Sequence, residues 1–376
     1  MPKKIVICCD GTGNEFGDAN SNVVKLYSTL IINNEQVGYY HPGVGTMGAP
    51  TARGRIEKAW TRIKGLAFGA GLLDNVADAY RYLMDTYADG DQIYLFGFSR
   101  GAYTARVLGG VLHMFGLLCP GNQGHLPYVM RMYAARRRNA GRHTPTAGVD
   151  EQFKYTFSRD VRLHFVGVWD TVSSVGWIYD PIKLPFAGQN PIIDIGRQAI
   201  SIDERRCFFQ PMLWISAHAR QDIKQVWFTG VHSDVGGSYP EKESGLSKLA
   251  LEWMLVQAVE AGLLVNRSKA NCVLGRGCSE RFLPRYVPPD SGAQKHESLA
   301  GAWWLFELLP HRYDQKPGKA SSEGWRIPLG AHRVIPDHAC IYEPALARIA
   351  SNRLPTSFVR EPRVVFPFEQ AMQTSA

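Results

Sequence analysis

Short runs of nearly continuous apolar residues recur along the first two thirds of the chain, separated by segments of helical periodicity. Such unbroken runs are typical of parallel strands that are covered on both faces. Five runs are predicted to be strands: residues 4–9, 36–40, 92–98, 162–169 and 225–231. Helical patterns are found at residues 21–30, 72–90 and 245–263. This alternation predicts a three-layer α/β fold with a mostly parallel central sheet and right-handed crossovers.

Two stretches interrupt the alternation and are predicted to be insertions over one end of the sheet. Residues 119–160 hold a basic, helix-like piece with a polar tail, and residues 177–222 hold scattered prolines and glycines followed by a helical pattern. From about residue 265 onward the pattern is irregular. We therefore expect a core at 1–265 and a C-terminal extension at 266–376 that packs on it.

The segment GFSRG joins the third predicted strand to a helical pattern. In an open parallel sheet, ligands bind beyond the carboxyl ends of the strands, where this turn lies. A serine nucleophile on such a sharp turn needs small neighbours, which Gly97 and Gly101 provide. The N–H of Arg100 would supply half of an oxyanion hole. Ser99 is the predicted nucleophile, and the alternative is an ordinary turn in which Ser99 caps the helix.

A serine hydroxyl needs a general base and a carboxylate that orients the base. In folds of this kind the acid follows the serine in the chain and the histidine comes last. Asp170 directly follows a predicted strand and is the expected acid, unless it only caps the next turn. Of the six histidines after Asp170, only His232 directly follows a predicted strand, so it is the expected base. The alternative is a loop histidine that bonds to the backbone.

The loop CDGTGN after the first predicted strand has several possible roles. Gly11 or Thr12 is expected to supply the second oxyanion donor. The loop also resembles a phosphate cradle, although it lacks the spacing of a nucleotide-binding motif. Asp10 is either a structural cap of the loop or, with Asp234, part of an oxygen-ligand metal site. The expected chemistry requires no metal and no other cofactor.

The composition is that of a soluble globular protein with a moderately basic balance. The net charge is +8 and the isoelectric point is about 9.1. This charge permits contact with anionic lipids, and no nucleic-acid partner or particular oligomeric state is expected. One basic segment is predicted to help the protein meet an anionic membrane, the alternative being a solvated helix face. Its members are Arg131, Arg136, Arg137, Arg138 and Arg142.

The seven cysteines are irregularly spaced, and no CxxC pair occurs. This pattern predicts reduced thiols in a chain that folds in the cytosol. The apolar run near the N-terminus is too short for a signal peptide, and no run approaches the 18 residues of a membrane-spanning helix. The protein is therefore expected to be cytoplasmic as synthesised.

Several longer segments resemble one known family. They are CDGTGN, YYHPGVGT, YADGDQIYLFGFSRGAYTAR, FVGVWDTVSSVG, AISIDERRCFF and VWFTGVHSDVGGSYPE, in family order across about residues 4–263. The family is the α/β-hydrolase domain family that includes the phospholipase effectors of type VI secretion systems.

The resemblance implies an α/β-hydrolase fold, a triad of Ser99, Asp170 and His232, a glycerophospholipid substrate, and export by a type VI system as a possibility. Near its end this chain has Tyr342 where family members often have a histidine. The expected function is that of a serine hydrolase that cleaves carboxylic esters, most simply a phospholipase or lipase. The alternative is a non-catalytic phosphate- or ligand-binding protein on the same fold.

Overall fold

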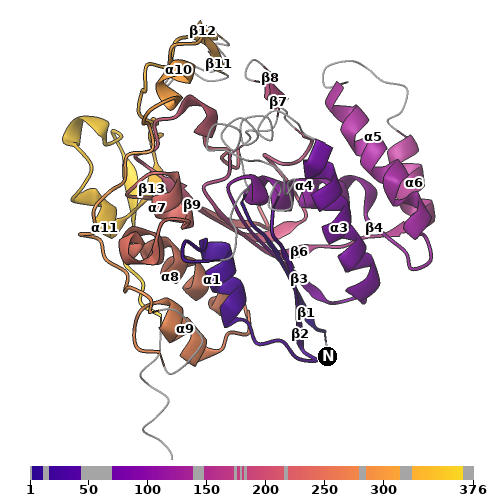
Figure 1. The fold of residues 1–376 in the computed structure, drawn as a ribbon. Coiled ribbons are helices and arrows are strands. Elements are labelled where there is room, and N and C mark those ends of the chain that lie inside the picture. Colours follow the sequence, from indigo (N-terminus) through magenta and orange to yellow (C-terminus); the bar gives the residue numbers. More distant parts are fainter. Residues whose placement is uncertain are drawn as a thin grey trace, which may run out of the picture.

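An eight-stranded parallel sheet forms the centre of the molecule (Figure 1). The computed structural model describes residues 2–11, 17–43, 70–138, 148–172, 176–177, 180–181, 184–215, 219–278, 285–313 and 324–366. In chain order the strands are β1 (Lys4–Cys9), β2 (Gln36–His41), β3 (Gln92–Phe98), β6 (Leu163–Trp169), β9 (Ile193–Ser201), β10 (Asp222–Phe228), β13 (Ala339–Tyr342) and β14 (Phe358–Glu361). In space the order is β14-β13-β10-β9-β6-β3-β1-β2, and every neighbouring pair is parallel. The carboxyl ends of all these strands therefore share one edge, where ligands bind in such folds.

Helices cover both faces of the sheet and complete three layers, as the sequence predicted. The main ones are α1 (Asn22–Thr29), α3 (Ala70–Thr86), α4 (Arg100–Phe115), α5 (Leu126–Arg138) and α8 (Gly245–Glu260). Figure 1 shows α3 and α4 on one side of the sheet and α1 and α8 on the other. Alternate residues of β1 enter the two cores: Ile5 and Ile7 pack with α3 and α4, whereas Val6 and Cys8 pack with α1 and α8. This is the expected α/β-hydrolase-like sandwich.

The remaining elements are short. The helices are α6 (Val149–Phe157), α7 (His232–Gly236), α9 (Arg267–Val273), α10 (Trp303–Glu307) and α11 (Glu343–Leu346), with 3-10 turns at Gln123–His125, Cys207–Phe209, Glu241–Glu243 and Ser351–Arg353. Three two-stranded pairs join β4 (Leu117–Leu118) to β5 (Ser158–Arg159), β7 (Gly176–Trp177) to β8 (Asp180–Pro181), and β11 (His311–Tyr313) to β12 (Gly324–Arg326). Among the described residues, no helix combines the length and apolar character needed to cross a membrane.

The hydrophobic pattern does not predict one of the central strands, β9 (Ile193–Ser201). β9 lies between β6 and β10, although its residues fall inside the stretch 177–222 that was expected to be an insertion. Arg197 and Gln198 interrupt its apolar pattern, but both are buried. Arg197 donates to the side chain of Gln257 at 2.5 Å, and Gln198 donates to the carbonyl of Met212 at 2.9 Å. Because distant groups satisfy these polar side chains, a reading of local hydrophobicity misses the strand.

Two other boundaries differ from expectation. β10 ends at Phe228 instead of residue 231, because the chain turns at Gly230, whose φ of 107° suits a residue without a Cβ. Beyond residue 265, β13 and β14 add two strands to the edge of the sheet. This part of the expected C-terminal extension therefore shares the sheet with the core.

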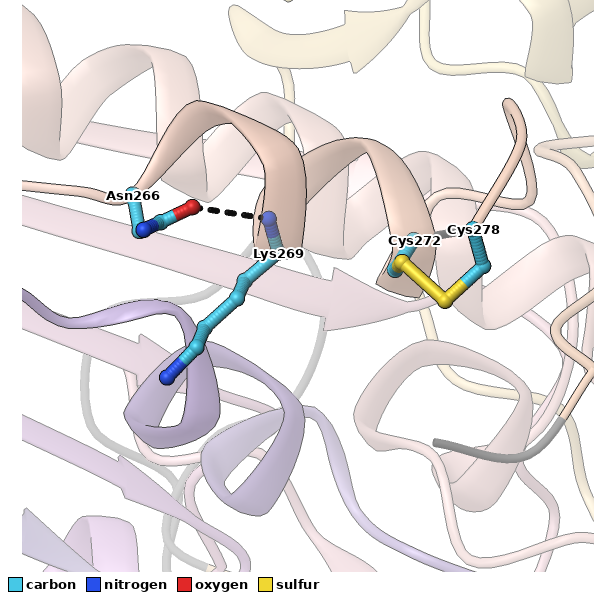
Figure 2. The surroundings of a disulfide bond; sticks show 4 residues. All are labelled: Asn266, Lys269, Cys272 and Cys278. Atoms are coloured by element: carbon cyan, nitrogen blue, oxygen red, sulfur yellow. Dashed lines mark hydrogen bonds between the residues drawn. A yellow bond between two sulfur atoms is a disulfide. The ribbon is translucent and has the colours of Figure 1, made fainter. Parts of the chain in front are cut away.

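A disulfide joins Cys272, at the end of α9, to Cys278 (Figure 2). The prediction that all seven cysteines are reduced is therefore wrong for this pair, and the other five are free. Figure 2 also shows Asn266, which begins α9 by accepting a hydrogen bond from the N–H of Lys269 at 3.0 Å. Disulfides persist mainly in oxidising compartments, so the cysteine pattern does not support the cytosolic folding inferred from it.

Candidate active site

Ser99 lies on a strained turn between β3 and α4. Its φ is 58°, in the left-handed region that is costly for a residue with a Cβ. A Cβ on Gly97 would lie 2.6 Å from the carbonyl oxygen of Gly101, and one on Gly101 would lie 2.1 Å from the carbonyl oxygen of Cys9. Both neighbours must therefore be glycine. The Ser99 side chain does not cap α4, so helix capping does not explain this serine.

His232 begins α7, directly after the turn that follows β10. Its Nε2 is 2.8 Å from Ser99 Oγ, and its Nδ1 is 2.6 Å from Asp170 Oδ2. The ring packs between Phe98 and Phe209, at centroid distances of 4.6 Å and 4.8 Å. Gly236 allows α7 to approach this closely, because a Cβ there would lie 1.9 Å from the Phe98 ring. The packing holds both ring nitrogens toward their partners.

Asp170 follows β6 and is fully buried. Besides His232, its carboxylate accepts hydrogen bonds from the N–H of Ser201 at 2.9 Å and from the Ser201 hydroxyl at 3.1 Å. These partners lie on β9 and α7, and Arg333 of the C-terminal segment adds a further contact; among the described residues, none of the hydrogen bonds given for the carboxylate comes from the turn that follows it. The structure brings together the three side chains that chain order selected.

Burial and neighbouring charges set the protonation of this cluster. Burial alone would raise the pKa of Asp170, but the charge of Arg333 and the hydrogen bond with His232 outweigh it and hold that pKa well below its usual range. Burial lowers the pKa of His232 below 6.5, and the opposing effect of Asp170 does not reverse this. At neutral pH His232 is then neutral and Asp170 ionised, as a general base and its orienting carboxylate require.

Two buried charged residues that the sequence analysis did not select surround the cluster. Arg333 contacts both carboxylate oxygens of Asp170. Glu204 accepts a hydrogen bond from the backbone N–H of His232 at 3.2 Å. Glu204 belongs to AISIDERRCFF, one of the segments that carry the family resemblance, but the resemblance assigns it no role. Arg333 lies in the irregular C-terminal part, where no local pattern marks it.

Comparison with known proteins places the chain in a family. Residues 3–257 match the model of the catalytic domain of Tle1-like phospholipase effectors of the type VI secretion system. The chain belongs to this family. The predicted resemblance is therefore confirmed, and membership supports a phospholipase- or lipase-type hydrolase. Arg333 lies beyond the matched residues.

Two individual relatives are also similar to parts of the chain. An uncharacterised protein of Saccharomyces cerevisiae is 36% identical over 223 residues, which cover 56% of this chain and 32% of the yeast protein. The crystal structure of an uncharacterised protein from Pseudomonas aeruginosa has a TM-score of 0.41 and 18% identity, and covers 70% of this chain and 46% of that one. The chain thus spans less than half the length of either relative.

Three residues are candidate oxyanion donors, and the structure gives a hydrogen bond for the backbone N–H of one of them, Gly11. Arg100 is the first residue of α4, directly after Ser99. The N–H of Gly11 donates to Asp10 Oδ1 at 2.6 Å, so in this structure it is directed to that carboxylate. Thr12 lies outside the described residues. The oxyanion role of the Arg100 N–H therefore stays a prediction.

Asp10 and Asp234 have separate sets of partners. Asp10 accepts hydrogen bonds from the hydroxyls of Ser21 and Tyr40, each at 2.7 Å, which fits a structural cap of the loop. Asp234 accepts from the N–H of Val231 at 3.0 Å and lies 2.6 Å from Nδ1 of His296. Within the described ranges, no group of three or more His, Cys, Asp or Glu side chains is arranged to hold a metal ion. The contacts thus favour the structural reading of Asp10.

The basic segment is partly neutralised. Arg136 on α5 forms an ion pair with Asp150, and both side chains are less than one fifth exposed. Arg131 packs over the ring of Tyr128 at 5.3 Å. The side chains of Arg137 and Arg138 and the whole of Arg142 lie outside the described residues. Arg136 is therefore not the solvent-exposed cation that the membrane prediction assumed.

Proposed function

We propose that the protein is a serine hydrolase that cleaves carboxylic esters of glycerophospholipids. The observation that carries the proposal is the continuous hydrogen-bonded chain from Ser99 through His232 to Asp170, at 2.8 Å and 2.6 Å, with the serine on a strained turn. Family membership supports a lipid ester as the substrate class. The backbone strain at Ser99 supports a functional reason for its position, because such strain persists where the surrounding structure enforces it.

The reaction would follow from the positions of these groups. Ser99 Oγ attacks the acyl carbon while His232 Nε2 takes the hydroxyl proton. The N–H of Arg100 and a second donor hold the tetrahedral oxyanion. His232 then gives its proton to the leaving alcohol oxygen, and a water molecule that His232 activates hydrolyses the acyl-enzyme. Asp170 keeps the proton of neutral His232 on Nδ1 and stabilises the imidazolium that forms in each step.

Access to lipid and cellular location are separate parts of the proposal. The enzyme would act at an anionic membrane surface, and Arg131 would contribute to that contact. Of the two basic-segment side chains that the structure describes, Arg136 is ion-paired with Asp150, whereas Arg131 packs on Tyr128. Export by a type VI system would accord with the family. Vesicle binding by Arg131→Ala at low and high salt tests the first part, because the attraction between basic side chains and anionic lipid is screened by salt. Equal binding by variant and wild type at low salt would contradict it.

The test of the catalytic proposal uses Ser99→Ala, with Ser28→Ala as the matched control. Ser28 lies on α1, where its hydroxyl bonds the carbonyl of Lys25. Ser99→Ala should lower the turnover of short p-nitrophenyl esters and of phospholipid by at least about 10³-fold, because triad residues act as a unit. A fluorophosphonate probe should label wild type and Ser28→Ala on Ser99, and should leave Ser99→Ala unlabelled.

An inactive, unlabelled wild type would contradict the catalytic proposal. If folded wild type is neither labelled nor active on any ester, the hydrolase proposal fails. The alternative, a non-catalytic phosphate- or ligand-binding protein on this fold, would then gain support from phosphate binding that survives Ser99→Ala.

A further inference from the structure

We propose that Arg333 is a positioning residue of the active site and that it holds the Asp170 carboxylate in the orientation that His232 requires. The proposal rests on the proposed hydrolase function. It assigns part of the catalytic apparatus to the C-terminal segment, outside the residues 3–257 that the family model matches.

The contact between Arg333 and Asp170 is bidentate. Nη1 of Arg333 lies 2.6 Å from Asp170 Oδ1, and Nη2 lies 3.1 Å from Oδ2. A guanidinium that donates to both oxygens fixes the plane of the carboxylate as well as its position. His232 Nδ1 bonds the same Oδ2. The plane that Arg333 sets therefore determines the direction in which Asp170 meets the imidazole ring.

Arg333 is itself held by the loop and strand around the site. Nη1 also donates to the carbonyl oxygen of Ser201 at 2.9 Å and to its hydroxyl at 2.6 Å, and Nη2 donates to the carbonyl oxygen of Phe209. Only 7% of the residue is exposed. The end of β9 and the loop after it thus fix Arg333. Its contacts with Asp170 lead to Nδ1 of His232, and its bond to the Phe209 carbonyl holds the backbone of a residue whose ring packs on His232.

Charge balance gives the contact a consequence that a purely structural role would lack. Asp170 is fully buried, and it shares its negative charge between the Arg333 cation and the His232 ring. Without the cation, that charge would stabilise the imidazolium alone, and the apparent pKa of the Asp170–His232 pair would rise. Arg206 and Glu204 also act on His232, lowering and raising its pKa respectively. Both stay in place in the variants below.

The experiment compares Arg333→Met and Arg333→Lys in the full chain. Arg333→Met should lower kcat/KM for a soluble ester by about 100-fold, mainly through kcat, because the misplaced acid misorients the base. The acidic limb of its pH profile should move to higher pH, since that limb reports the pKa of the base in the free enzyme. Arg333→Lys keeps the positive charge but cannot donate to both carboxylate oxygens in one plane. Its kcat should therefore fall, while the acidic limb of its pH profile should lie closer to that of wild type than the limb of Arg333→Met does.

Arg353→Met is the matched control. Arg353 comes from the same segment and donates to Asp203 at 2.9 Å and to the carbonyl of Ile202 at 2.8 Å, so its guanidinium holds a neighbouring carboxylate instead of Asp170. This variant should leave the acidic limb where it is in wild type. Histidine NMR of the inactive Ser99→Ala protein, with and without Arg333→Met, gives the same pKa comparison independently of turnover.

Removing one partner of a buried ion pair can unfold a protein, so the design includes a variant that leaves no orphaned charge. Asp170→Asn with Arg333→Met should be no slower than Asp170→Asn alone, because Arg333 acts through the Asp170 carboxylate. A further 100-fold loss in the double variant, or wild-type rate and acidic limb in folded Arg333→Met, would overturn the proposal. If wild type is inactive and Ser99 unlabelled, the proposed function fails first, and that result is distinct from either of these.

Discussion

Two Asp–His pairs in the described part of the chain have the same hydrogen-bond distance but different surroundings. Nδ1 of His232 lies 2.6 Å from Asp170, and Nδ1 of His296 lies 2.6 Å from Asp234. The His232 ring packs between two phenylalanines and its other nitrogen faces the Ser99 hydroxyl. The His296 ring stacks on Tyr239 at 3.6 Å between centroids. Its other nitrogen lies 3.2 Å from the Glu243 carboxylate.

The two pairs show that a short Asp–His contact does not by itself make a general base. Burial lowers the pKa of His232 and outweighs the effect of Asp170, so the ring stays neutral near pH 7. Burial also acts on His296, but less of that ring is covered, and the hydrogen bonds with Asp234 and Glu243 reverse its effect and raise the pKa. A neutral ring beside a hydroxyl can accept a proton, whereas a ring held between two carboxylates favours its charged form.

The largest expected difference comes from removing each histidine. His232→Ala should lower esterase kcat by up to about 10⁶-fold, because the nucleophile and its base act together. His296→Ala should retain activity within about tenfold, because that ring lies outside the proposed proton path. Steady-state kinetics on a soluble ester measure both, with thermal melting as the check of folding. Comparable losses in the two variants would remove the distinction drawn between the pairs.

Replacing the two aspartates should give a smaller difference in kcat than replacing the two histidines. Asp170→Asn should lower kcat by about 10⁴-fold, because the amide no longer favours the tautomer with the proton on Nδ1. Asp234→Asn keeps an oxygen that can accept from the N–H of Val231, so α7 should keep its place and activity should fall by less than about tenfold. The same assay measures both variants. An Asp170→Asn enzyme with more than a tenth of wild-type activity would contradict the role assigned to Asp170.

The first of these pairs could be predicted from the sequence and the second could not. Ser99, Asp170 and His232 each follow a buried strand directly, so a local pattern and the topology of a parallel sheet are enough to bring them to one edge. His296 lies in an irregular segment and does not directly follow a predicted strand, so the topology of the sheet does not place it beside Asp234 or Glu243. No periodicity encodes such contacts.

Contacts that no local pattern encodes also explain the other differences between the predicted and the observed structure. β9 is hidden by Arg197, whose partners Gln257 and Asp222 lie on other elements. Arg333 meets Asp170 across 163 positions. The Cys272–Cys278 bridge depends on the chain turning back after α9 through Gly275 and Gly277, both with positive φ. Hydrophobic pattern and motif locate the elements and the residues that directly follow a strand, whereas the partners of polar side chains elsewhere become interpretable only in the folded chain.

The smallest predicted effect concerns stability as a function of pH, and it has opposite signs for the two histidines. The folded-state pKa of His296 lies above 6.5, so its pairing stabilises the protein fully below that value and the contribution is lost as pH rises through the raised pKa. The folded-state pKa of His232 lies below 6.5, so the contribution of the neutral ring is present above that value and is lost as pH falls through the lowered pKa.

Urea unfolding of wild type, His296→Gln and His232→Gln at about pH 5.5 and about pH 8.5 tests both signs, because both pH values keep the carboxylates ionised. The difference in free energy of unfolding between wild type and His296→Gln should be larger at the lower pH than at the higher pH. The increase should be up to about 1 kcal/mol, the usual size for a partly exposed ion pair. For His232→Gln the deficit relative to wild type should instead be larger at the higher pH. If both deficits change in the same direction, the opposite charge states assigned to the two rings are wrong.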